Sequence, residues 1–248
     1  MTDISAQDPA APRANHLDGL RIIKTLDHLH QRISARFPHS GLSGVCAELA
    51  ATARLTETRA AGLAKPYLAL RCALGLVIFV AIVAVVLMTT HLHLEGVARA
   101  DPVSLTQGLE SLVNLLALAG AAVWFLLTVE TRLKRRLAHT ALSELRAFAH
   151  VIDMYQLTKD PTVVVGGGPQ TSVSPKRDMS QFELARYLDY CAEMLALIAK
   201  LAALYERAHA DPEISAAANG VETLTSDLGR KIWQKITIIG QLAEVPRS

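Results

Sequence analysis

Two long apolar segments dominate the pattern of hydrophobic and polar positions along the chain. Residues 67–88 consist almost entirely of Leu, Val, Ile, Ala and Phe, and residues 105–129 form a second such segment. A helix needs about 20 consecutive apolar residues to cross the hydrocarbon core of a bilayer. The pattern therefore predicts two membrane-spanning helices joined by the short connection 89–104. The alternative is a soluble protein with a buried helical hairpin, which the length of both segments disfavours.

Apolar residues outside the spans recur at steps of three and four, which is typical of amphipathic helices. Residues 16–65 carry this pattern, with Asn15 and Asp18 at the expected N-cap and N3 positions and a break at Pro38 and Gly41. We expect two cytoplasmic helices here, the second running into span one. Residues 1–15 are expected to be a disordered tail.

Span two is expected to begin at a capping box formed by Ser104 and Gln107. No Gly or Pro occurs between Ala121 and Asp160, and the helical apolar pattern persists through residues 130–161. Span two and this stalk are therefore predicted to form one long helix that ends at the Asp-Pro pair 160–161.

The segment 162–179 contains three consecutive glycines and is interpreted as a flexible linker. Ser180 and Glu183 then form a capping signature, and Asp211 followed by Pro212 marks a second helix start. Residues 180–248 are accordingly expected to form C-terminal cytoplasmic helices.

Composition agrees with an all-α membrane protein. Hydrophobic residues make up 51% of the 248 residues, aromatic residues only 5%, and the net charge is +2. Ala and Leu favour helix over sheet, and the balanced charge gives no indication of nucleic-acid binding. The predicted fold is a two-span transmembrane hairpin with a cytoplasmic bundle built from the N- and C-terminal helices.

Basic residues flank the spans asymmetrically. Before span one or near its start lie Arg54, Arg59, Lys65 and Arg71, after span two lie Arg132, Lys134, Arg135 and Arg136, and the connection between the spans has only Arg99. Basic flanks stay on the cytoplasmic side, so both termini are expected in the cytoplasm, with the hairpin in the inner membrane. The basic group after span two is also expected to form a collar that attracts lipid headgroups.

Glu110 and Asn114 lie within span two, where polar side chains are costly unless protein or water covers them. Ala117 and Ala121 follow on nearly the same face and permit close helix approach. Three interpretations remain open: packing against span one, a seam between copies of the chain, and the lining of a pore.

A second candidate site lies at the end of the stalk, where polar residues are crowded. The four residues are His150, Asp153, Tyr155 and Lys159, and the next helix offers Tyr187, Asp189, Tyr190 and Glu193 as partners. They indicate either a binding cluster or ordinary hydrogen bonds between helices. The sequence contains no recognisable nucleophile, metal or cofactor motif, so neither enzymatic activity nor a cofactor is expected.

The segments Ala149–Pro161 (AHVIDMYQLTKDP) and Phe182–Cys191 resemble parts of uncharacterised bacterial two-span membrane proteins. The resemblance implies a bacterial inner-membrane location and transfers no activity. The two-span layout also resembles, by architecture alone, the membrane effector domains of nucleotide-signalled bacterial defence systems.

The function expected from these features is a non-enzymatic, membrane-anchored helical assembly module. We expect it to self-associate and to contact the lipid bilayer, with a cytoplasmic protein as a further partner. The alternative is an oligomeric pore-forming or ligand-gated membrane effector.

Overall fold

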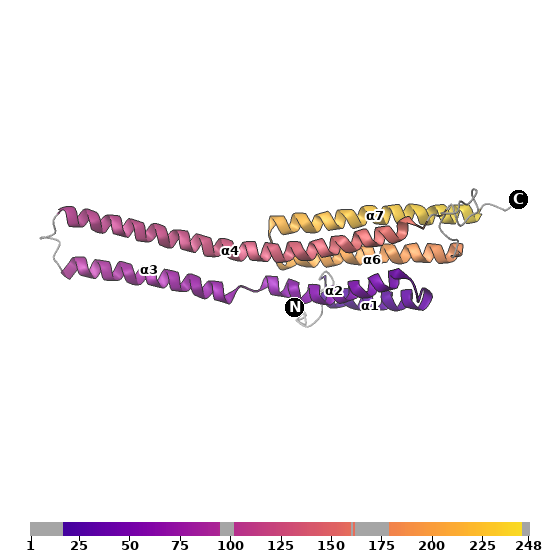
Figure 1. The fold of residues 1–248 in the computed structure, drawn as a ribbon, viewed down its shortest axis with the longest axis horizontal. Coiled ribbons are helices and arrows are strands. Elements are labelled where there is room, and N and C mark those ends of the chain that lie inside the picture. The colour runs from indigo at the N-terminus through magenta and orange to yellow at the C-terminus, as the bar shows by residue number, and fades with distance from the viewer. Residues whose placement is uncertain (1–16, 95–101, 160, 162–178, 245–248) are drawn as a thin grey trace, which may run out of the picture. The chain divides into compact units, whose positions relative to one another are not determined.

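The computed structural model describes residues 17–94, 102–159, 161 and 179–244, and every regular element in these ranges is an α-helix. The expected tail and nearly all of the expected linker lie outside these ranges. Figure 1 shows the helices in chain order: α1 (Gly19–Arg36), α2 (Gly41–Ala64), α3 (Leu68–Leu94), α4 (Pro102–Leu157), α6 (Gln181–Ala208) and α7 (Pro212–Glu244). The all-α prediction is confirmed.

The chain divides into two compact units. Unit 1 comprises the chain up to Gly62 and from His139 onward, and unit 2 is Leu63–Ala138. The long helix α4 contributes to both units.

The two C-terminal helices begin at the predicted caps. Ser180 Oγ accepts the Glu183 amide at 3.2 Å, and Glu183 Oε2 accepts the Ser180 amide at 2.8 Å, which completes a capping box. Asp211 Oδ1 accepts the Glu213 amide at 3.0 Å, and Pro212 is the first residue of α7. Both caps satisfy amides that lack partners at a helix start.

Two other predicted helix starts are wrong. The N-cap of α1 is Asp18, whose Oδ1 accepts the Leu20 amide at 3.0 Å, so Asp18 is not at N3; Asn15 lies outside the described residues. The helix α4 already begins at Pro102, which places Ser104 in its first turn instead of at the cap. Proline suits the first helical position because its fixed φ is helical and no amide is lost there.

Helix α2 does not run into the first apolar segment as expected. It ends at Ala64, and α3 begins at Leu68. Pro66 lies in the interruption, where it has no amide to donate and disfavours helical backbone at Lys65. The expectation of one long helix after the connection is confirmed, because α4 has 56 residues.

Unit 1 has a continuous apolar core. Helix α6 packs along α7 and against α1. The core positions recur every three or four residues, and they include Leu26, Leu29 and Ile33 of α1, Leu42 and Leu49 of α2, Leu145 and Ile152 of α4, Leu188, Leu195 and Tyr205 of α6, and Ile214, Val221 and Ile232 of α7. Each such side chain contributes about 1.5–3 kcal/mol through removal from water.

Unit 2 has the opposite burial pattern, with large apolar side chains on its surface. Phe79 of α3 is 62% exposed and Trp124 of α4 is 71% exposed. Two helices are long and apolar enough to cross a membrane, and none of their most apolar segments is buried. Among the described side chains of unit 2, half-buried positions recur along one side of each helix, and they include Leu70, Leu74, Val77, Ala81 and Ala84 on α3, and Leu112, Leu115, Ala119, Ala122 and Leu126 on α4. We infer that the two helices of unit 2 face each other through these stripes.

Candidate functional site

The four candidate residues of the second apolar segment lie together on one exposed face of α4. The side chains of Glu110, Asn114, Ala117 and Ala121 are all exposed, whereas Leu115 on the opposite side of the helix is half-buried. The four positions are separated by four, three and four residues, so they form one stripe along the helix. Packing within unit 2 therefore does not cover this stripe.

The four candidates at the end of the stalk do not converge on one point. His150 is exposed, Asp153 Oδ1 accepts a hydrogen bond from Gln156 Nε2 at 2.5 Å, and Lys159 lies over the Tyr187 ring at 5.3 Å from Nζ to the ring centroid. Tyr155 contacts the start of α2, where its hydroxyl occupies the space that a Cβ on Gly41 would need. The Asp153–Gln156 hydrogen bond lies within α4, whereas the contacts of Tyr155 and Lys159 reach neighbouring helices, so the four side chains do not form one common site.

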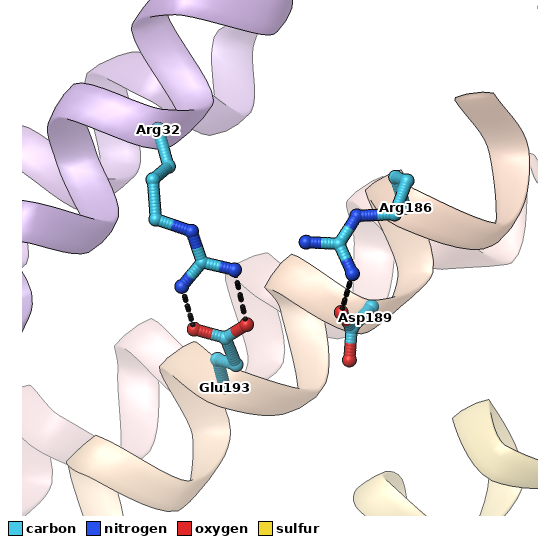
Figure 2. A network of polar contacts seen from close by, with 4 residues as sticks. All are labelled: Arg32, Arg186, Asp189 and Glu193. Carbon is cyan, nitrogen blue, oxygen red and sulfur yellow. Dashed lines mark hydrogen bonds and ion pairs between the residues drawn. The ribbon is translucent and has the colours of Figure 1, made fainter. Parts of the chain in front are cut away.

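A network of ion pairs between four charged side chains lies on α1 and α6 (Figure 2), and the sequence predicted Asp189 and Glu193 only as partners for the end of the stalk. Arg32 of α1 donates two hydrogen bonds to the Glu193 carboxylate, at 2.8 and 2.9 Å, and Arg186 donates one to Asp189 at 2.6 Å. Both guanidinium groups lie 5.1 Å from the centroid of the Tyr190 ring. Each arginine therefore has a carboxylate partner and a shared aromatic surface.

The charges of this network stabilise the contact between α1 and α6. Burial raises the pKa of Tyr190, but the nearby Arg186 and Arg36 guanidinium groups outweigh it and leave the pKa below its usual value. Arg32 and Glu193 are 161 positions apart in the chain, so no local pattern indicates their pairing. The spacing of Arg186 and Asp189, three residues apart on one helix, is the signal that sequence reading missed.

The predicted headgroup collar requires one correction. Lys134 is only 6% exposed, its Nζ lies 3.0 Å from Glu130 Oε1, and it lies over the Tyr67 ring. It therefore does not face lipid headgroups. Arg132 and Arg136 are exposed and Arg135 is half-buried. The i,i+4 order of Glu130 and Lys134 is the favourable one for an ion pair on a helix.

Comparison with known proteins gives no assignment: no family model, curated protein or solved structure matches this chain. Within the described ranges, no group of three or more His, Cys, Asp and Glu side chains is placed to hold a metal ion.

Proposed function

We propose that the protein is a non-enzymatic, membrane-anchored assembly module whose copies associate through the exposed stripe of Glu110, Asn114, Ala117 and Ala121 on α4. The proposal rests on one observation: the two polar and two small side chains of this stripe are all exposed. The helices of unit 1 supply a cytoplasmic surface for a second copy or a protein partner.

Membrane insertion is supported by the contrast between the two units. The helices of unit 1 bury a core that is stable in water, whereas α3 and the first part of α4 expose side chains such as Phe79 and Trp124. Exposed apolar surface of this length is stable only when lipid replaces water around it. The basic residues before span one and after span two favour cytoplasmic termini and an inner-membrane location.

Self-association is supported by the cost of leaving polar groups in lipid. An ionisable side chain facing hydrocarbon costs roughly 2.5 kcal/mol or more at the bilayer centre, and less toward the surface. A second copy placed against α4 would cover Glu110 and Asn114, and the small side chains of Ala117 and Ala121 would permit close approach.

The test replaces Asn114 with Leu and Ala117 with Ile. Asn114→Leu should weaken association by about 1 kcal/mol, in line with intramembrane polar contacts, and Ala117→Ile should block it sterically. The readout is oligomeric order in nanodiscs, measured by crosslinking and native mass spectrometry. Both variants should still insert, because each makes span two at least as hydrophobic as before.

Leu116→Ile is the matched control. It introduces the same β-branched side chain as Ala117→Ile, about 100° around the helix, at an exposed position outside the stripe. If both stripe variants keep the wild-type oligomer, association does not occur through α4 and this part of the proposal fails.

A pore or ligand-gated effector is the second candidate, favoured by the same two polar residues. In an oligomer that surrounds water, Glu110 and Asn114 would line the opening and unit 1 would sense the signal. Single-channel recording in planar bilayers separates the two functions. A conductance whose ion selectivity changes in Glu110→Gln would favour the pore. Oligomers that conduct no ions would favour the assembly module.

A further inference from the structure

A groove opens between the two helices of unit 2, close to the start of α3. It has a volume of about 390 Å³, and its lining consists of Leu70, Arg71, Leu74, Gly75 and Ile78 from α3 with Leu126, Leu127 and Glu130 from α4. Leu70 and Ile78 are eight residues apart, which corresponds to about 12 Å along the helix. This length is most of the roughly 15 Å of hydrocarbon in one leaflet of a bilayer.

The lining carries one cation, Arg71, and one anion, Glu130, and Lys134, which is not part of the lining, pairs with Glu130. Glu130 accepts a hydrogen bond from Lys134 at 3.0 Å and one from the Tyr67 amide at 3.4 Å. The hydrogen bond from Lys134 lowers the pKa of Glu130, and the charge of Arg71 adds to this effect. Because Lys134 pairs with Glu130, the positive charge of Arg71 is the one left without a paired carboxylate among these three side chains.

Arg71 is the cation of this group that a ligand can reach. Lys134 is almost fully buried between Glu130 and the Tyr67 ring, whereas the side chain of Arg71 is exposed at the groove. A guanidinium group binds phosphate oxygens through two parallel hydrogen bonds, and its long apolar stem lies along hydrocarbon. The groove thus combines an apolar floor with one phosphate-binding group at its charged end.

We propose that this groove binds one anionic phospholipid, with an acyl chain along Leu70, Leu74 and Leu126 and the headgroup phosphate on Arg71. The inference rests on the proposed membrane insertion and does not depend on self-association. An acyl chain suits the apolar lining, and an anionic headgroup neutralises the remaining positive charge. The site differs from a diffuse collar because one arginine and one groove define it.

The test uses the full-length protein in nanodiscs that contain equal parts of phosphatidylcholine and phosphatidylglycerol. Native mass spectrometry after release from the nanodisc counts the lipids retained per chain. The wild type should retain phosphatidylglycerol in preference to phosphatidylcholine. Arg71→Gln should lower this preference about fivefold, which is the effect expected of one basic residue at a membrane surface.

Gly75→Leu tests the groove itself. Gly75 is part of the groove lining, and a Cβ there meets no atom within 4 Å, so the backbone leaves room for a side chain to begin at this position. Leucine is also a better helix former than glycine. This variant should reduce retention of both lipids, whereas Arg71→Gln should affect mainly the anionic one.

Two matched controls should keep more of the lipid preference than Arg71→Gln and Gly75→Leu do, because neither changes the groove. Arg132→Gln removes an exposed charge of the collar, and Gly120→Leu adds the same side chain to α4 at another open position. An equal loss in Arg71→Gln and Arg132→Gln would show diffuse attraction and overturn the site.

Two further outcomes would also overturn it: equal retention of the two lipids by the wild type, or crosslinking of a Gly75→Cys variant to a second copy without bound lipid. Failure of the protein to enter nanodiscs would instead reject membrane insertion. The two failures are therefore distinguishable.

Discussion

Lys235 shows how a single side chain stabilises the end of the longest helix. Its Nζ donates hydrogen bonds to the Gln156 carbonyl at 2.8 Å, to Gln156 Oε1 at 2.7 Å and to the Lys159 carbonyl at 3.4 Å. The last carbonyls of a helix lack intrahelical partners and carry partial negative charge. An ammonium group from α7 therefore satisfies the C-terminus of α4 and holds the two helices together.

Replacing Lys235 with Met should lower the free energy of unfolding by about 1–3 kcal/mol, because charged hydrogen bonds are lost while the apolar stem is kept. Thermal and denaturant unfolding of the solubilised protein measure the change. Lys231→Met, at an exposed position one turn earlier in α7, should change stability by at most about 0.5 kcal/mol. Equal effects of the two substitutions would contradict a capping role for Lys235.

At the scale of elements, α7 is held by its apolar stripe. Leu228 is only 4% exposed and Ile232 is fully buried, whereas Asp227, next to Leu228 in the chain, forms a surface ion pair with Arg230. Surface ion pairs of this kind contribute about 0–1 kcal/mol. Burial of the apolar stripe therefore contributes most to the packing of α7 against the other helices of unit 1.

Leu228→Asp or Ile232→Asp should reduce the abundance of folded protein strongly, because a buried charge without a partner costs several kcal/mol. Asp227→Ala is the neighbouring control and should leave abundance close to wild type. Quantitative blotting of the soluble and membrane fractions measures both. Equal tolerance of all three substitutions would show that the stripe does not form a core in the cell.

At the scale of the whole molecule, the proposed topology places both termini in the cytoplasm and the connection 89–104 outside. A reporter fused after Ser248 should give a cytoplasmic signal, and Gly96→Cys, outside the described residues, should react with an impermeant thiol reagent added to intact cells. The physical reason is that the basic flanks resist translocation. Labelling of Gly96→Cys only after lysis would reject this topology.

The native cysteines provide the background for this experiment. Burial raises the pKa of Cys46 and of Cys191 to about 12, so neither forms the reactive thiolate near neutral pH. Cys72 is exposed on α3, near the end of span one expected to face the cytoplasm. Wild-type cells should therefore remain unlabelled by the external reagent.

Local patterns along the chain were sufficient to predict the helices. The apolar segments, the caps at Ser180 and Asp211 and the length of α4 each depend on residues within a few turns of one another. Short-range sterics and hydrogen bonds decide such features, and these are visible in sequence. The errors at Asp18, Ser104 and Pro66 are also local, and each shifted or misjudged only a helix boundary.

Pairing between distant residues was decided only in the folded chain. No pattern indicates that Arg32 meets Glu193, that Lys235 caps α4 or that Lys134 is buried against Tyr67. Such contacts depend on which helix faces meet, and many arrangements of amphipathic helices bury similar apolar area. The sequence alone determined the all-α class and two apolar helices long enough to cross a bilayer. Tertiary packing decided that the stripe of Glu110 and Asn114 faces outward and that Arg71 lies at an open groove.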